Sequence, residues 1–352
     1  MRGLAPSIEA CGTTPSPSRF AGPSLLSVCR RAHEERGDNL VHPSFSVIVF
    51  TTASGAGYGL LALLGVLAPL GAVPNGTVFA VVALGLALGL VTAGLISSTF
   101  HLGHPERALR AFSQWRSSWL SREGVASVAT YAPACLFAAA WVFLGNVSAI
   151  LGTLAAIGAI VTIVCTAMIY RSLKPIQRWH NSWVVPNYLA LALMTGVLWL
   201  ALLLRLFGAG TTGVAWLVLV AVIFAAVLKL GYWRFIDKCA SASTAESATG
   251  LGALGKVRLF EAPHSSENYL LKEMGFKIAR KHAAKLRRIA ILLAFALPFL
   301  LSLVPLLGAG WPAALAALIA APLATVGVLI ERWLFFAEAK HAVTLYYGAA
   351  RA

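Results

Sequence analysis

Long apolar runs alternate with short polar links along most of this chain. Eight runs reach or approach the roughly 20 apolar residues that a helix needs to cross a bilayer core. They lie at residues 44–67, 78–100, 124–145, 148–170, 185–205, 210–228, 289–307 and 312–330. None alternates apolar and polar residues with a period of two, as the strands of a membrane β-barrel do. The pattern therefore predicts an all-α integral membrane protein with eight transmembrane helices.

The composition indicates the same class of protein. Of the 352 residues, 59% are hydrophobic and only 12% are charged, whereas about 25% of the residues of soluble domains are charged. The mean hydropathy is +0.78. The five cysteines have no spacing typical of a zinc or iron–sulfur site, and so no metal site is predicted.

The basic residues distinguish the two ends of the predicted bundle. The chain has 28 Lys and Arg against 13 Asp and Glu, a net charge of +15. All the acids, and every basic residue except Arg205, fall in the terminal segments and in the links 101–123, 171–184 and 229–288. By the positive-inside rule we expect both termini and these three links to be cytoplasmic. The basic character thus indicates membrane topology and contact with anionic lipid, and does not argue for nucleic-acid binding.

We expect three regions along the chain. Residues 1–40 are polar and lack the apolar core of a signal peptide, so they are either a disordered N-terminal extension or an over-long reading of the gene. Residues 41–340 would form the eight-helix membrane domain, and residues 341–352 a C-terminal tail. Within the domain, the basic stretch 268–288 has apolar residues at near-helical spacing. It is either an amphipathic helix on anionic lipid or a docking element for a partner.

The link after the second run, "FHLGHPERALRAFSQWRSSWLSRE", carries most of the candidate chemistry. His101 and His104 are expected where the second helix meets the membrane surface, followed by a short interfacial helix. Glu123 is expected to open the third helix, where the helix dipole favours an acid. Anchoring at the membrane surface explains most of the Arg and Trp residues of this link.

A quinone headgroup also stops at this depth. Quinone chemistry requires a hydrogen-bond donor for each carbonyl oxygen and a group that carries protons. His and Glu at the membrane rim supply both, since His titrates near neutral pH. His101, His104, Arg107 and Glu123 are therefore candidate quinone-site residues, with plain anchoring as the alternative. In a similar link, "YRSLKPIQRWHNSW", His180 is a further candidate proton carrier, or else an interfacial residue between two membrane-belt tryptophans.

These links resemble those of a known family. "HLGHPERALRAF" resembles the HLG-x-P-x-R-A-x-x-x-F element of the membrane anchor subunits (DmsC family) of dimethyl sulfoxide reductase-type molybdoenzymes, in which an acid opens the next helix. "HPSFSVIVFTT", "SLKPIQRWHNSW" and "NYLLKEMGFKIARKHAAKLRR" resemble the sulfite dehydrogenase branch of that family. The resemblance covers residues 42 to about 340 and includes the number of helices.

The resemblance implies a subunit without a catalytic metal of its own. Such a subunit holds a molybdopterin catalytic subunit and an iron–sulfur subunit at the membrane, and exchanges electrons with ubiquinone or menaquinone. The resemblance places the quinone near the HLG element, which favours His101, Arg107 and Glu123 as site residues. Gly103 would allow close approach of the headgroup, whereas His104 stands at a position that the family does not fix.

The same resemblance, combined with the charge map, suggests where the complex lies. The HLG end would face the cytoplasm from the bacterial inner membrane, and both partner subunits would bind there. If the basic stretch 268–288 is a docking element and not a lipid-bound helix, the iron–sulfur subunit would be the partner that it docks.

Two rival classes are disfavoured by the positions of ionisable residues. None of the eight His lies in the middle of an apolar run, so a haem held between helices by axial His is not expected. No charged residue is expected at mid-membrane depth, and Lys229 comes closest, at the end of the sixth helix. Ion-coupled transporters usually carry such residues, so their absence disfavours this class. A polytopic secondary transporter is kept as the alternative function.

Overall fold

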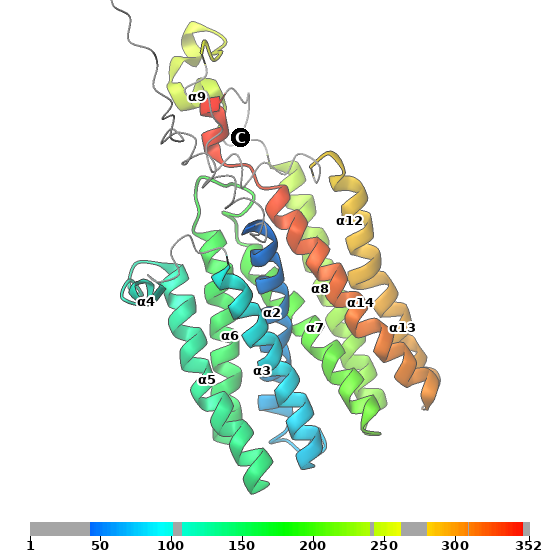
Figure 1. Cartoon of the computed structure of the whole chain (residues 1–352). Coiled ribbons are helices and arrows are strands. Elements are labelled where there is room, and N and C mark those ends of the chain that lie inside the picture. The colour runs from blue at the N-terminus through cyan, green and yellow to red at the C-terminus, as the bar shows by residue number, and fades with distance from the viewer. Residues whose placement is uncertain (1–42, 101–107, 240–242, 262–279, 309, 348–352) are drawn as a thin grey trace, which may run out of the picture. The chain divides into compact units, whose positions relative to one another are not determined.

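The computed structural model describes residues 43–100, 108–239, 243–261, 280–308 and 310–347, all within one compact unit, Val41–Ala352. These residues contain no β-strand, and eight of their helical segments are long and apolar enough to cross a membrane (Figure 1). The prediction of an all-α protein with eight membrane helices is confirmed. The structure does not describe segment 1–40, the boundary that follows it or the stretch 268–279. The division into three regions therefore stays a prediction.

The eight spans have these bounds: α2 (Pro43–Leu67), α3 (Thr77–Thr99), α5 (Trp119–Leu144), α6 (Ala149–Arg171), α7 (Val184–Leu206), α8 (Thr212–Lys238), the composite α12, η3 and α13 (Ala283–Ile291, Leu292–Ala296 and Leu297–Leu307), and α14 (Trp311–Ala337). Four short helices lie in the links and after the last span: α4 (Ala108–Phe112), α9 (Ala245–Thr249), η2 (Leu251–Leu254) and η4 (Ala342–Tyr347). Consecutive spans run in opposite directions (Figure 1). The links that carry basic residues therefore meet at one end of the bundle, called the charged end below.

Four spans extend further toward the charged end than their apolar runs predict. The third begins at Trp119 instead of 124, the sixth ends at Lys238 instead of 228, the seventh begins at Ala283 instead of 289, and the eighth ends at Ala337 instead of 330. Charged residues that were expected in links thus belong to membrane helices, where several are buried: Glu123, Lys229, Glu331 and Arg332. The expectation that no charged residue lies at mid-membrane depth stays a prediction, but burial of charged residues inside the bundle was not expected.

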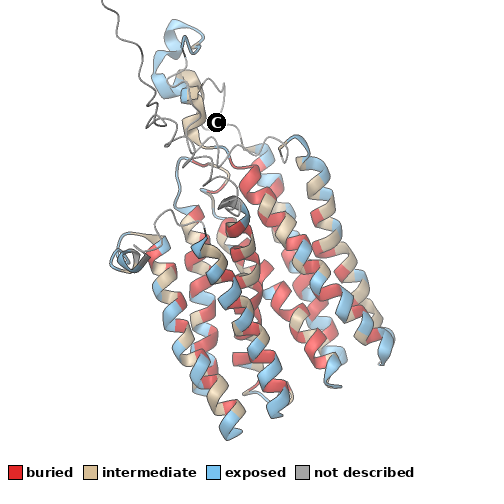
Figure 2. Cartoon of the chain, in the orientation of Figure 1, coloured by how far each residue is buried: buried red, intermediate tan, exposed pale blue. Residues whose placement is uncertain are grey.

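Helix α2 lies at the centre of the bundle and packs against α3, α6, α7 and α14. Glycines allow the closest of these contacts. A Cβ atom added at Gly59 would lie 1.9 Å from the carbonyl oxygen of Ala192 in α7, and one at Gly65 would lie 2.3 Å from that of Gly152 in α6. Only glycine fits at such backbone contacts between membrane helices. The buried faces of the helices accordingly turn inward (Figure 2).

The seventh span is not a regular α-helix. Its central five residues, Leu292–Ala296, form a π-helical turn just before Pro298, whose ring nitrogen cannot donate a backbone hydrogen bond. Helix α14 packs closely against this turn, because a Cβ at Gly327 would lie 2.3 Å from the backbone nitrogen of Ala294. This contact helps to fix the position of α12 beside α14.

Candidate functional site

Glu123 is the predicted site residue that the structure describes most fully. The Ser118 side chain caps α5 by accepting a hydrogen bond from the backbone N–H of Ser121 at 3.4 Å. The helix therefore begins at Trp119, and the expectation that Glu123 opens it is wrong: Glu123 lies in the second turn. The residue is only 5% exposed, and Thr166 of α6 donates a hydrogen bond to its Oε1. Its carboxyl group is thus held inside the bundle, near the charged end.

Polar side chains continue from Glu123 along the contact between α5 and α6. The hydroxyl oxygens of Thr130 and Thr162 lie 3.2 Å apart. Thr162 also lies 2.9 Å from the carbonyl oxygen of Gly158, one turn back on its own helix. The hydroxyls of Thr92 and Tyr131 meet at 2.6 Å between α3 and α5. The Thr130–Thr162 pair thus places polar groups in the interior between α5 and α6, whereas the Thr92–Tyr131 pair is exposed.

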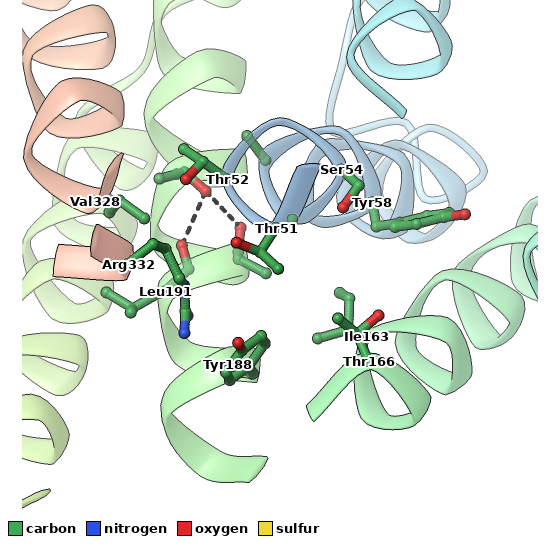
Figure 3. A pocket seen from close by; sticks show the side chains of 14 residues that line it. Thr51, Thr52, Ser54, Tyr58, Ile163, Thr166, Tyr188, Leu191, Val328 and Arg332 are labelled. Atoms are coloured by element: carbon green, nitrogen blue, oxygen red, sulfur yellow. Dashed lines mark hydrogen bonds between the residues drawn. The ribbon is translucent and has the colours of Figure 1, made fainter. Parts of the chain in front are cut away.

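A small cavity lies between α2, α6, α7 and α14 (Figure 3). Its volume is about 20 Å³, and its lining includes Thr52, Tyr58, Thr166, Tyr188 and Arg332. The hydroxyl groups of Thr52, Tyr58 and Tyr188 are buried and make no hydrogen bond to any residue that the structure describes. A buried water molecule needs about this volume and two to four polar partners. The cavity therefore suits one water molecule, and Thr166 connects its wall to the Glu123 carboxyl group.

Three charged residues form a buried cluster beside this cavity. The Lys229 ammonium group pairs with Oε1 of Glu331, and Nε of Arg332 lies 3.4 Å from Oε2 of the same carboxylate. None of the three side chains is more than 3% exposed. The Arg332 guanidinium also lies 3.7 Å from the ring centroid of Tyr188, and the Lys229 nitrogen lies 4.3 Å from that of Tyr232. Aromatic faces attract cations, which helps to offset the loss of water around this cluster.

The hydropathy pattern does not predict this cluster, because Lys229 directly follows the sixth apolar run and is expected at the end of that helix. A signal was nevertheless present. Lys229 directly follows one apolar run, and Glu331 directly follows another that also ends at the charged end of the bundle. Charges of opposite sign at the same depth on two helices can pair, and a buried charge in a membrane helix usually has such a partner.

The second predicted cluster has a different arrangement from the one expected. Trp179 is not a belt residue: its indole N–H donates to the carbonyl oxygen of Phe335 at 2.9 Å, and its ring stacks on that of Phe335 inside the bundle. His180 is exposed, with Nδ1 2.6 Å from the carbonyl oxygen of Arg171. No contact within the described part of the chain joins His180 to Glu123, and its role as a proton carrier stays a prediction.

Four predicted site residues lie outside the described residues: His101, Gly103, His104 and Arg107. The structure does place both ends of their link. The hydroxyl of Ser97, at the end of α3, donates to the carbonyl oxygen of Ser46 in α2 at 3.0 Å. After the link, α4 packs on α5, with the Phe112 ring directly over Gly124. The link 101–107, called the HLG link below, therefore leaves from beside α2 and leads into α4, which packs against Gly124, the residue after Glu123.

Comparison with known proteins gives a match over nearly all of the described chain. Residues 39–348 match the family described as DMSO reductase anchor subunit (DmsC). The chain is also 34% identical over 336 residues to a sulfite dehydrogenase subunit of Allochromatium vinosum, in an alignment that covers 87% of this chain and 99% of the relative. No solved structure matches the chain.

Proposed function

Because this chain belongs to the DMSO reductase anchor subunit (DmsC) family, we propose that it is the membrane anchor of a heterotrimeric molybdopterin oxidoreductase. In this proposal it exchanges electrons between ubiquinone or menaquinone and an iron–sulfur subunit, as part of respiratory electron transport. Molybdopterin and the iron–sulfur clusters belong to the partner subunits. The observation that carries the proposal is the family match over residues 39–348, which includes all eight spans.

We place the quinone headgroup at the rim of the bundle, between the HLG link and α5. The cavity of about 20 Å³ is far smaller than the roughly 300–1,000 Å³ of typical ligand pockets, so it cannot enclose the ring. Glu123, which Thr166 connects to this cavity, lies in the second turn of α5, and the next residue, Gly124, packs against Phe112 of α4. This arrangement supports a headgroup that stops at the link and exchanges protons with a carboxyl group just below it.

The proposed role of Glu123 is to take up or return a proton. Oxidation of a quinol releases two electrons and two protons; the electrons pass to the iron–sulfur subunit, and a base must accept each proton. The carboxylate of Glu123 can accept one of the two protons and remain hydrogen-bonded to Thr166, and the other proton passes to water at the rim of the bundle. In the reverse direction, the protonated carboxyl group returns the proton to the reduced quinone.

The partner subunits are proposed to bind at the charged end, on the cytoplasmic side of a bacterial inner membrane. Support comes from the positive-inside rule, because the other four links contain no Lys or Arg except Arg205, which lies at the end of α7. The HLG link, Glu123 and the basic start of the seventh span all lie at this end. The partners would thus dock on the side from which the quinone site is reached.

The first test is copurification of the tagged protein in mild detergent, with mass spectrometry of the proteins that accompany it. We expect a molybdopterin subunit and an iron–sulfur subunit, and the identity of the larger one would name the substrate. A protein that stays alone at good yield would contradict the anchor function. That result would favour a secondary transporter, for which the buried cluster of Lys229, Glu331 and Arg332 is the supporting observation.

The second test separates the quinone site from assembly of the complex. In the intact complex, Glu123→Gln should lower quinone-linked turnover by about 10²-fold or more, the usual contribution of a positioned acid or base. Turnover with a soluble dye that bypasses the anchor subunit should not change. Glu261→Gln is the matched control, since Glu261 is an exposed acid in the link after η2. Normal quinone-linked turnover in both Glu123→Gln and His101→Ala would place the site elsewhere.

A further inference from the structure

A second hollow, of about 730 Å³, opens at the charged end. Its polar lining consists of six basic residues and one acid: Arg178, Arg280, Lys281, Arg287, Arg288, Lys340 and Glu338. They come from three parts of the chain, namely the link between α6 and α7, the start of the seventh span, and the segment after α14. We refer to this feature as the basic hollow. It is separate from the small cavity beside Thr166, and the two share no lining residue.

Two of the basic residues hold the hollow together. Arg287 of α12 donates hydrogen bonds to Asp237 at 2.6 and 3.0 Å, and to Glu338 at 2.7 Å. Arg280 donates to the carbonyl oxygens of Ala337 and Ala339, at 2.7 and 2.9 Å. These bonds tie the start of the seventh span to the ends of α8 and α14. The hollow is therefore a built feature of the fold, with walls fixed by paired side chains.

The remaining four basic residues are available to a ligand. Arg178, Lys281, Arg288 and Lys340 form no ion pair with any acid in the part of the chain that the structure describes. The one acid in the lining, Glu338, is already engaged by Arg287. Among the residues that the structure describes, the hollow thus has more basic than acidic side chains and favours an anionic ligand. Its volume lies within the range of typical small-ligand pockets.

The position of the hollow on the seventh span indicates which kind of anionic ligand fits it. Arg287 and Arg288 lie near the start of the seventh span, just before its apolar run, so we expect the hollow to lie where the polar surface meets the hydrocarbon. Further along the same span, Leu292 and Leu300 are 48% and 57% exposed on the outside of the bundle. A water-soluble protein covers only the polar part of this surface. A phospholipid can place its phosphate among the basic residues and its acyl chains along the exposed leucines.

We propose that the basic hollow is a specific binding site for the phosphate headgroup of an anionic phospholipid. Basic pockets between membrane helices on the cytoplasmic side are typical sites for such headgroups. The bound lipid would join the link between α6 and α7, the start of the seventh span and the segment after α14 through one shared anion. The site does not depend on the proposed electron-transfer function, and its test uses no assay of turnover.

The test measures lipid bound to the purified full-length protein by native mass spectrometry. The protein is delipidated, then mixed with micelles that contain phosphatidylglycerol or phosphatidylcholine, or with inorganic phosphate. We expect bound phosphatidylglycerol, little phosphatidylcholine and no effect of inorganic phosphate. The double variant Lys281→Gln/Arg288→Gln should bind phosphatidylglycerol about 30-fold more weakly, because each basic residue near the surface contributes roughly a fivefold effect.

Two control proteins keep the result interpretable. Arg110→Gln/Arg116→Gln removes two exposed basic residues that do not line the hollow, and lipid binding should be unchanged. Lys281→Arg/Arg288→Lys keeps the charge and should also keep lipid binding, which shows that loss in the glutamine variant does not come from misfolding.

Three outcomes would overturn the proposal. The first is equal binding of phosphatidylglycerol by the wild-type protein and the glutamine variant. The second is displacement of the lipid by millimolar inorganic phosphate, which would indicate a free-phosphate site. The third is loss of copurifying protein subunits in the glutamine variant with lipid binding unchanged, which would make the hollow a protein-docking surface.

Discussion

Lys229, Glu331 and Arg332 show how single buried charges constrain this bundle. Two cations share one carboxylate, so the cluster carries a formal charge of +1 in a region that solvent does not reach. Removing one partner of a buried ion pair costs about 3–5 kcal/mol when it leaves a charge uncompensated. The cost should therefore depend on which member of the cluster is removed.

We predict that Glu331→Gln destabilises the protein more than Lys229→Met. The first substitution leaves two buried cations without a counter-ion and should cost about 3–5 kcal/mol. The second leaves a neutral pair of Arg332 and Glu331, so its cost should be clearly smaller. Thermal unfolding in detergent, followed by the fluorescence of the ten Trp residues, measures the difference. Equal destabilisation by the two variants would mean that Lys229 and Arg332 do not share Glu331 in the membrane.

The site residues differ in how far the sequence could predict them. Glu123 could be selected as a candidate from the sequence because it is an acid that follows the HLG element. Its burial was not predictable, because the start of α5 depends on the Ser118 cap and not on hydropathy. The pairing of Lys229 with Glu331 joins helices about 100 residues apart in the chain, and a local pattern does not show such a contact. Trp179 was misassigned for the same reason, because its partner, Phe335, lies 156 residues away.

At the scale of helices, the predicted boundaries are accurate at one end of the bundle and poor at the other. At the end without basic links, every predicted boundary lies within two residues of the observed one. Turns there stop the helices sharply, with Gly71, Gly145 and Gly208 in left-handed conformations. At the charged end, four boundaries differ by five to ten residues. Hydropathy falls at the first charged residue, but the helix continues when that residue finds a partner inside the bundle.

The contact between α2 and α7 gives a prediction about packing. Gly59→Ala should destabilise the protein, because the added methyl group would lie 1.9 Å from the Ala192 carbonyl oxygen. Overpacking of this kind costs about 1–3 kcal/mol or more, and should lower the unfolding midpoint by on the order of 5 °C. Gly85→Ala in α3 is the control, since an added Cβ there meets no atom within 4 Å. It should leave the midpoint unchanged or raise it slightly, because alanine favours helix. A stable Gly59→Ala protein would contradict the close approach of these two helices.

At the scale of the whole molecule, the arrangement of charge predicts how the bundle is oriented. Opposite directions of consecutive spans bring the basic links, the HLG link, Glu123 and the basic hollow to the same end. The other end is formed by links with no Lys or Arg beyond Arg205, and it is closed by contacts such as that of the Trp141 indole N–H with the carbonyl oxygen of Asn75. If the positive-inside rule holds, the proposed quinone site, lipid site and partner surface all face the cytoplasm.

Labelling of single cysteines in intact cells tests this orientation directly. In a protein whose native cysteines are replaced, Asn75→Cys and Ser172→Cys place exposed thiols at opposite ends of the bundle. A membrane-impermeant maleimide should label the first in intact cells and the second only after the cells are permeabilised. Labelling of both sites after permeabilisation is the control for accessibility. The reverse pattern would place the charged end outside the cytoplasm, and the partner subunits of this anchor would then have to be exported before they could bind to it.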